Sequence, residues 1–487
     1  MVELEFIGGA QTVTGSKHLV RTSRTTVLLD CGLYQGRRME SIERNQALPL
    51  PIDELDAVVL SHAHIDHAGA LPLLCKRGYR GPVYATPATR DLCAAMLEDA
   101  ASIQLSDARH IAELIEREGS SMDPVEPLYD QADVAVTLGQ MIGLPYGHPQ
   151  LIAPGVTLTF LDAGHVLGSA IVVLDLEDEG VTTRLAFTGD LGRPHLPILR
   201  DPQVPEGVDY LLSESTYGDR LHAPIEETSE ALALAIERTY QRGGKVIIPS
   251  FALERAQEVI YELKRLQTRG RLPPLPIYVD SPLTVKLTDV FKLHPECYDA
   301  ATFELLQSGQ SPFELEGLRY VSDVEESKAI DADERPCIII SASGMCEAGR
   351  VLHHLRTTIE DWRNTVVIVG FQAAHTLGRR LVERRAEVRI FGVMRTRAAE
   401  VVVLDGFSAH ADQAGLLEFA EAVRRRGRLR GVFLVHGEPR AQSTLTEKLT
   451  QRGFEAVQSP APGTRIRLEP APVASALTIA SSAIQLK

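Results

Sequence analysis

The sequence predicts an α/β protein, and two patterns carry this prediction. In residues 1–217, strand-like segments end in polar or acidic residues at turns, as in sheets whose carboxyl ends hold a site. In residues 218–405, nearly continuous apolar strands alternate with amphipathic helices, which is typical of a separate doubly wound domain around a buried parallel sheet. Residues 406–487 return to the pattern of residues 1–217, in which strands end in polar residues at turns.

The strands of the first part are predicted from five segments: TTVLLD, DAVVLSH, VTLTFLDAGH, TRLAFTGD and DYLLSE. A helix over roughly 89–118 interrupts them, and we expect it to pack beside the sheet because its apolar residues recur at about helical spacing. These apolar residues are Leu92, Met96, Ala100, Ile103 and Leu105.

The second part contains four strand-then-helix units. They begin at KVIIPS, PIYVDSP, CIIISASGM and TVVIVGF. After residue 406 come GVFLVHGEP and further helices. The tail from about 468 is rich in Ala, Ser and Pro, and the sequence leaves open whether it is flexible or packs on a neighbour.

Composition limits the classes of function. No apolar run approaches the roughly 20 residues of a membrane helix, and the start reads as a strand, so we expect a cytoplasmic protein without membrane contact. The net charge of −15 argues against nucleic-acid binding by broad electrostatics alone. Arginines nevertheless crowd residues 378–431, either as solvated helix faces or as a local wall for phosphates. The six cysteines lack zinc-knuckle spacing, so any metal site must use histidine and carboxylate.

The segment SHAHIDHAG, residues 61–69, follows an apolar strand and carries four metal-binding side chains. His62 and His64 are alternate residues of an extended segment and can face one metal. Asp66 and His67 fall at an expected helix start and can turn toward a second. Each residue alone is explained by a polar loop or a core histidine. The whole string favours a pair of ions, zinc first, with manganese or iron as alternatives.

This string resembles the HxHxDH signature of the metallo-β-lactamase fold, and further parts of that pattern follow in order. Asp30 ends VLLDCG, His165 lies in DAGHVLGSA, and Asp190 lies in FTGDLG. The resemblance implies an αββα sandwich holding two zinc ions. It implies the following roles: His62, His64 and His165 on one metal, Asp66 and His67 on the other, Asp190 bridging them, and Asp30 orienting a ligand.

Three later segments, LLSESTYGDR, DGFSAHAD and LVHGEP, resemble the additional motifs of the β-CASP branch of this fold, which processes nucleic acids. They contain Glu214, His410 and His436. An α/β domain inserted between the first and second of these motifs is that branch's architecture. The chain most resembles bacterial stand-alone ribonucleases related to the endonuclease subunit of the cleavage and polyadenylation specificity factor. By this resemblance His436 completes the second metal set and favours RNA over DNA.

The resemblance implies a two-metal hydrolysis of phosphodiester bonds in single-stranded RNA. A hydroxide shared by the metals attacks phosphorus, and Asp66 and Asp190 serve this chemistry as ligands. His410 is the candidate general acid for the leaving 3′ oxygen, and Glu214 keeps its ring charged. The products are a 5′-phosphate and a 3′-hydroxyl. Internal cutting and 5′-to-3′ trimming both remain open, as do a DNA nuclease, a thioesterase or lactonase, and a catalytically silent scaffold.

Contacts to the RNA backbone are predicted at strand-to-helix turns, where amides and hydroxyls can meet phosphate, although ordinary helix capping explains each turn equally well. A single strand is expected because the inserted domain should close over the metals. Few aromatic residues argue against extensive base stacking. The resemblance alone suggests a homodimer. The candidate contacts are Ser250, Arg255, Ser341, Ser343, Gly344, Arg379 and Ser408, with Arg380 beside Arg379.

Overall fold

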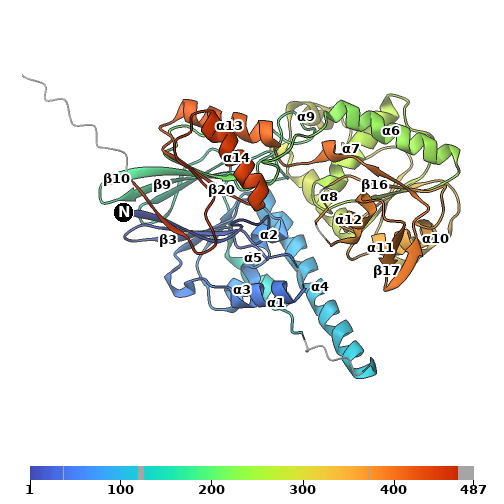
Figure 1. The fold of residues 1–487 in the computed structure, drawn as a ribbon, viewed down its shortest axis with the longest axis horizontal. Helices are drawn as coiled ribbons and strands as arrows, with labels where there is room; N and C mark the ends of the chain where they lie inside the picture. The colour runs from blue at the N-terminus through green and yellow to red at the C-terminus, as the bar shows by residue number, and fades with distance from the viewer. Residues whose placement is uncertain (37, 119–124, 371, 374, 470–487) are drawn as a thin grey trace, which may run out of the picture.

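The computed structural model describes residues 1–36, 38–118, 125–370, 372–373 and 375–469, and its first lobe contains two facing sheets (Figure 1). One sheet has the order β22 (Arg465–Leu468), β1 (Val2–Gly8), β2 (Lys17–Arg21), β3 (Thr26–Leu29), β4 (Ala57–Val59), β5 (Val83–Ala85), β6 (Met141–Gly143). The other has the order β21 (Val457–Gln458), β20 (Gly431–Val435), β11 (Tyr210–Glu214), β10 (Val181–Phe187), β9 (Ala170–Asp178), β8 (Val156–Asp162), β7 (Gln150–Ala153).

Alternation of apolar and polar residues explains why these sheets pack face to face. Along β8, every second residue from Val156 to Asp162 is buried, and the intervening residues are only half-buried. Leu4 and Phe6 of β1 join Phe160 of β8 in one core between the sheets. Burying each such side chain contributes about 1.5–3 kcal/mol. The inner layer therefore holds the strand ends that carry the site in fixed positions.

Helices cover the outer faces, which completes the expected αββα sandwich. The first sheet is covered by α3 (Leu71–Lys76), α4 (Pro87–Glu118) and α5 (Gln131–Gln140), and the second by α13 (Gln413–Arg426) and α14 (Pro439–Gln451). Two further helices, α1 (Arg38–Ala47) and α2 (Ile65–Ala68), lie near the strand ends of the first sheet. We call these two sheets and seven helices the sandwich lobe.

The predicted helix over 89–118 is present as α4, but only its first half packs against the lobe. Leu92 and Leu97 are fully buried, whereas Ile103 is 53% and Leu105 42% exposed. Figure 1 shows the end of α4 projecting beyond the rest of the lobe. The helix therefore packs beside the sheet as predicted, but Ile103 and Leu105 of the predicted apolar stripe are exposed and take no part in that packing.

The second lobe, here called the α/β lobe, is built on a six-stranded parallel sheet, as the alternating pattern predicts. Its order is β14 (Leu318–Val321), β13 (Ile277–Asp280), β15 (Ile338–Ser341), β12 (Val246–Pro249), β16 (Thr365–Ile368), β19 (Glu400–Val403). Helices α6 (Ile225–Gln241), α7 (Arg255–Thr268) and α8 (Pro282–Leu293) cover one face. Helices α10 (Val324–Ala332), α11 (Val351–Thr358) and α12 (Leu377–Val382) cover the other. One more helix of this lobe, α9 (Ala300–Gln307), follows α8 in the chain.

A short hairpin, β17 (Glu387–Ile390) and β18 (Val393–Thr396), stands outside this sheet and is not predicted by the sequence analysis. Three single-turn helices lie in the connections: η1 (Ile52–Glu54), η2 (Pro295–Cys297) and η3 (Asp405–Phe407). The chain leaves the sandwich lobe after β11 and returns after β19, so both crossings lie beside the strand ends described next.

Among the described helices, none combines the length and the apolar character needed to cross a bilayer. The Ala-, Ser- and Pro-rich tail predicted from about 468 lies, beyond residue 469, outside the described residues.

Candidate active site

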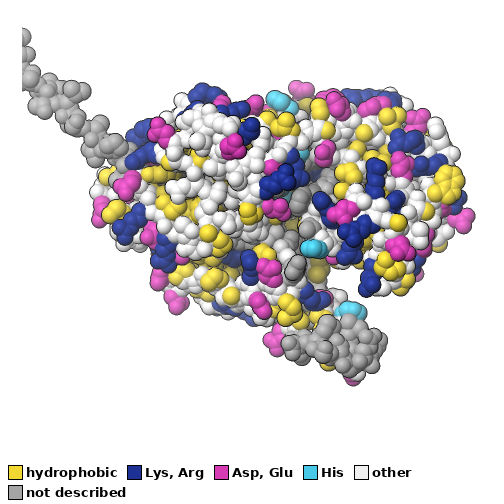
Figure 2. Space-filling view, viewed as in Figure 1, with side chains coloured by type: hydrophobic (Ala, Val, Ile, Leu, Met, Phe, Trp, Pro, Cys, Tyr) yellow, Lys and Arg dark blue, Asp and Glu magenta, His cyan; other side chains and the backbone are white. Residues whose placement is uncertain are grey.

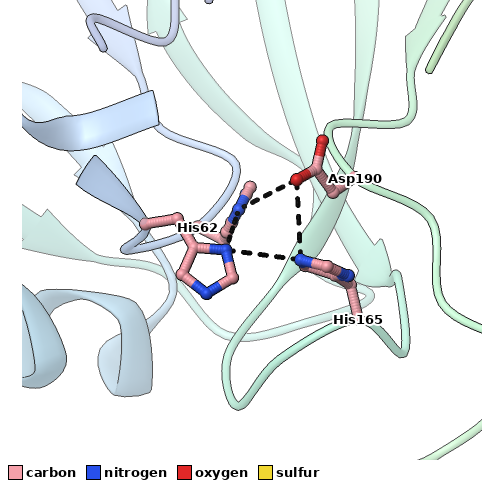
Figure 3. A group of neighbouring side chains, drawn as sticks. His62, His165 and Asp190 are labelled. Atoms are coloured by element: carbon pink, nitrogen blue, oxygen red, sulfur yellow. Dashed lines mark hydrogen bonds and ion pairs between the residues drawn. The ribbon is translucent and has the colours of Figure 1, made fainter. Parts of the chain in front are cut away.

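Four side chains from three loops of the sandwich lobe converge on one point. His62 and His64 follow β4, His165 follows β8, and Asp190 follows β10. His64 Nδ1 lies 3.1 Å from His62 Nε2 and 3.4 Å from His165 Nε2. One oxygen of Asp190, Oδ2, lies 3.5 Å from each of the Nε2 atoms of His62 and His165 (Figure 3). One ligand atom from each of the four lies within 4.8 Å of the others, which suits a metal ion.

A second set of donors lies on the other side of Asp190. Asp66 and His67 come from α2, and His436 follows β20 with a positive φ of 46°. His436 Nε2 lies 3.2 Å from His67 Nε2 and 3.4 Å from Asp66 Oδ2. The other Asp190 oxygen, Oδ1, lies 3.3 Å from His67 Nε2 and 3.1 Å from His436 Nδ1. Asp190 therefore presents one oxygen to each set.

Asp30 holds one ring of this cluster in place. Its carboxylate accepts the backbone N–H of Ser61 at 2.7 Å and lies 2.7 Å from His67 Nδ1. Because Nδ1 of His67 is engaged there, its Nε2 is free to face His436 and Asp190. A carboxylate behind a ligating imidazole fixes the ring in this way at many metal sites.

The electrostatics of the cluster suit a divalent cation. Burial lowers the pKa of His62, lowers that of His64 to about 3, and lowers that of His165 well below its ordinary value. These three rings are therefore neutral donors. Burial opposes the charged form of Asp190, but His436 and His67 outweigh it and hold its pKa well below the usual range. Burial opposes the charged form of His67 as well, but Asp190 and Asp30 raise its pKa well above the ordinary value. The three neutral imidazoles of the first set, beside an ionised carboxylate, match the ligand preference of zinc.

A histidine and a glutamate lie directly beside the first donor set. Both oxygens of the buried Glu214, at the end of β11, contact His410 Nδ1, at 3.0 and 3.2 Å. The His410 ring centroid lies 4.4 Å from that of His165. Burial works against the charged ring, but Glu214 and Asp190 prevail and raise the pKa of His410 to about 9. The protonated ring has a proton to donate beside the donor set.

The predicted phosphate contacts differ in burial, and several already have partners within the protein: the Ser343 hydroxyl, for example, accepts the Glu347 N–H at 3.2 Å. Arg255 is buried and paired with Glu258, and the Ser341 hydroxyl donates to the Asp280 carbonyl at 2.8 Å. Arg379 is exposed and lies 3.0 Å from Glu383. The remaining candidates lie in the loops that follow β12, β15 and η3: Ser250 after β12, Ser343 and Gly344 after β15, and Ser408 after η3, with Ser250 and Ser408 buried.

Glu254 links the two lobes and is missed by the sequence analysis. It belongs to the α/β lobe, yet its Oε2 accepts the backbone N–H of Leu167, two residues after His165, at 2.9 Å. Its backbone adopts φ 67° and ψ −56°, and the Arg255 N–H donates to the Leu253 carbonyl at 2.9 Å, which is a strained γ-turn. A buried carboxyl held in this conformation points to a positioning role for the His165 loop. The only sequence signal is its place inside PSFALER.

Replacing Glu254 with alanine is expected to weaken zinc affinity by about 10- to 100-fold, the usual cost of removing a group that orients a ligand. Burial, together with Glu258, raises the pKa of Glu254 well above its ordinary range, which favours the neutral carboxyl. Glu254→Gln keeps an oxygen for the Leu167 N–H and serves as the matched control. Competition with a fluorescent zinc chelator measures both, and equal affinities for the two variants would contradict the positioning role.

Comparisons with known proteins agree with this architecture. Family models match the metallo-beta-lactamase superfamily over residues 14–249, the Beta-Casp domain over 256–381, and the Zn-dependent metallo-hydrolase RNA specificity domain over 395–459. A ribonuclease of Thermus thermophilus is 40% identical over 451 residues, covering 92% of this chain and 96% of its own. The transcription termination factor FttA of Methanosarcina mazei is 34% identical over 463 residues, covering 93% of this chain and 69% of its own.

A solved structure gives the same result for the fold. A protein of unknown function from Enterococcus faecalis V583 has a TM-score of 0.53 at 13% identity, covering 96% of this chain and 100% of that one. The identity with the Thermus thermophilus ribonuclease extends over nearly the whole of both chains, and the predicted family and fold class are confirmed. The chain therefore belongs to the β-CASP ribonuclease family of the metallo-β-lactamase superfamily and is a metal-dependent hydrolase.

Proposed function

We propose that this chain is a zinc-dependent ribonuclease that hydrolyses phosphodiester bonds of single-stranded RNA and leaves a 5′-phosphate and a 3′-hydroxyl. The observation that carries the proposal is the arrangement around Asp190, whose two oxygens face separate donor sets, with the His410 ring 4.4 Å from that of His165. Two cation sites and one protonated imidazole are the groups that phosphodiester hydrolysis needs.

The two donor sets would hold two zinc ions, with manganese as the alternative. Bound zinc supplies a water molecule acidic enough to ionise near neutral pH. The first ion is assigned to His62, His64, His165 and Asp190, and the second to Asp66, His67, His436 and Asp190.

His410 is assigned to the leaving group. As the oxygen of water bonds to phosphorus, the bond from phosphorus to the 3′ oxygen breaks, and this oxygen takes a proton from His410. Glu214 accepts the backbone N–H of Leu191 at 2.6 Å and is fully buried, so its carboxylate is fixed against the imidazole. The fixed carboxylate keeps His410 charged until it releases its proton.

RNA is favoured over DNA and over small esters for two reasons. The segment matched by the RNA specificity domain, residues 395–459, contains both His410 and His436, and the most similar relatives reported above are named as a ribonuclease and a transcription termination factor. A thioesterase or lactonase has no use for the dyad of Glu214 and His410 or for the α/β lobe over the site. Figure 2 shows the surface dipping between the two lobes, and we assign this dip to the path of an extended single strand.

Parallel digestion tests the substrate. The zinc-loaded protein is incubated with labelled single-stranded RNA, single-stranded DNA and an RNA duplex of matching sequence. We expect cleavage of the single-stranded RNA at least about tenfold faster than that of DNA, since the 2′-hydroxyl is the group by which a protein distinguishes RNA from DNA. Faster cleavage of DNA would make the chain a DNA nuclease. Circular RNA and 5′-labelled linear RNA separate internal cutting from trimming, and sedimentation analysis tests the homodimer.

Removing the metal is expected to abolish cleavage, because in the proposed mechanism water is ionised on the bound metal. Dialysis against a chelator should reduce turnover to background, and about two equivalents of zinc per chain should restore it. Metal analysis by mass spectrometry gives the stoichiometry. Full activity at less than 0.1 equivalent of any transition metal would refute the proposal.

A further inference from the structure

The hairpin β17–β18 of the α/β lobe has one face buried against the lobe and one face exposed to solvent. Val388 and Ile390 are buried beneath it, whereas the strand register places Arg389 opposite Met394 on the outer face. Met394 is 49% exposed, and Phe391, in the turn, is 50% exposed. The hairpin thus presents apolar side chains and a guanidinium to solvent.

The residue choice in the turn is unusual for a hairpin. Phe391 and Gly392 form a two-residue turn with φ values of 48° and 76°. Positive φ at both positions is the geometry that favours Asn-Gly, and a bulky side chain there is disfavoured. Phe391 contributes neither to turn stability nor to the buried core. An exposed aromatic residue kept at a strained position points to a surface contact.

Two groups on α11 flank this ring. The exposed His353 ring has its centroid 4.7 Å from that of Phe391, and the guanidinium of the exposed Arg356 lies 5.9 Å from the Phe391 centroid. Proteins that bind single-stranded nucleic acids commonly combine an aromatic ring with a nearby cation, because a base stacks on the ring while the cation binds the phosphate.

Charge makes the same surface attractive to a polyanion. Residues 379–397 contain seven arginines and two glutamates, a local net charge of +5 in a chain whose net charge is −15. Within the part of the chain that the structure describes, Arg356, Arg384 and Arg389 form no ion pair, so their charges are uncompensated. Figure 2 shows Lys and Arg side chains gathered on this lobe over α11, α12 and β17.

Hydrogen bonds tie the two helices beside the hairpin, α11 and α12, to the loop that follows β15. The Val351 N–H, at the start of α11, donates to the Ala342 carbonyl at 3.4 Å, and the Gly378 N–H, in α12, donates to the Met345 carbonyl at 3.1 Å. Both acceptors belong to the SASGM loop after β15, one of the predicted phosphate contacts. RNA that passes this loop can therefore continue onto the hairpin.

We propose that Arg356, Arg384, Arg389, Phe391 and Met394, together called the hairpin surface, bind single-stranded RNA outside the active site. Phe391 stacks on one base, and the three arginines contact flanking phosphates. This deepens the proposed function, since it rests on RNA being the polymer that the chain binds. The surface lengthens the RNA that is held and takes no part in cleavage.

The test compares long and short RNA. In a His410→Ala background, which slows cleavage enough for a binding measurement, fluorescence anisotropy measures binding of a 24-mer and a 6-mer. We expect Phe391→Asn to weaken 24-mer binding about tenfold, within the range for loss of one stacked base. Asparagine suits the positive φ, so the melting temperature should stay the same or rise. Arg356→Glu with Arg389→Glu should also weaken 24-mer binding and lower the salt dependence by about two ions. With His410 restored, 6-mer cleavage should change less than about twofold.

Arg269→Glu with Arg319→Glu is the matched control, since these two arginines of the same lobe are also exposed, form no ion pair within the described residues, and carry the same charge change away from the hairpin. Unchanged 24-mer affinity in Phe391→Asn, or an equal loss in the control, would overturn the assignment. If the hairpin surface instead binds an acidic protein partner, Phe391→Asn should leave the affinity for the 24-mer unchanged. If the parent protein binds the 24-mer tightly but never cuts RNA, the proposed function fails while the hairpin surface stands.

Discussion

Asp190→Asn is expected to reduce RNA cleavage by at least about 10³-fold, the upper range for loss of one preorganised electrostatic group. The substitution keeps the shape of the side chain but removes the charge shared by both donor sets. Asp190 Oδ1 and Oδ2 lie between 3.1 and 3.5 Å from four imidazole nitrogens, so the lost charge is one that faces both donor sets. Zinc content should fall below two per chain.

The matched control for this variant is Asp162→Asn. Asp162 ends β8, three residues before His165, and lies 3.9 Å from Arg200. It is a buried carboxylate of the same lobe that belongs to neither donor set. Zinc content and turnover within about twofold of the parent are expected there. Retention of two zinc ions and of ordinary turnover by Asp190→Asn would remove Asp190 from its bridging role.

His410→Ala is expected to lower kcat by about 10²- to 10⁴-fold, the contribution of a general acid, without loss of zinc. A substrate with sulfur in place of the 3′ oxygen separates this role from a structural one, because a thiolate leaves without needing a proton. The deficit of His410→Ala should nearly vanish on that substrate. A deficit of equal size on both substrates would assign His410 to folding or binding.

The pH profile gives a second test of His410. Its pKa is raised to about 9, above the ordinary 6.5, so the ring holds its proton below about pH 9 and loses it above. Activity that depends on this proton is therefore retained through neutral pH and falls as the pH rises through about 9. In Glu214→Gln the group that mainly raises the pKa is neutral, so the fall should begin at lower pH.

Local sequence predicted much of the site because its ligands lie at strand ends, where motifs are short. Within six consecutive positions lie four of these ligands: His62, His64, Asp66 and His67. They converge on the candidate metal sites because one strand end and one helix start position them. Glu214 and His410 are 196 residues apart, and their contact at 3.0 Å was accessible only through the family resemblance.

Other features depend on tertiary packing and could not be read locally. Arg255 appeared to be a phosphate contact, yet burial of α7 turns it toward Glu258, one helical turn away. The hairpin β17–β18 has Phe-Gly at its turn and lacks the Asn-Gly pair that is typical of such turns, so it could not be predicted from the segment EVRIFGVMRT. Ile103 and Leu105 of α4 continue the apolar spacing of the helix but are exposed. Whether such residues are buried depends on how far the neighbouring surface extends, which the helix sequence does not show.

The contact between Glu254 and the Leu167 N–H has a thermodynamic consequence. Glu254 belongs to the α/β lobe and Leu167 to the loop of a candidate zinc ligand, so separation of the lobes must release that loop. Because coupling free energies are reciprocal, a polymer that draws the lobes together would tighten the hold on zinc, and zinc would favour the closed polymer complex by the same factor. Metal-depleted protein would then take up zinc more readily when a polymer is bound between the lobes.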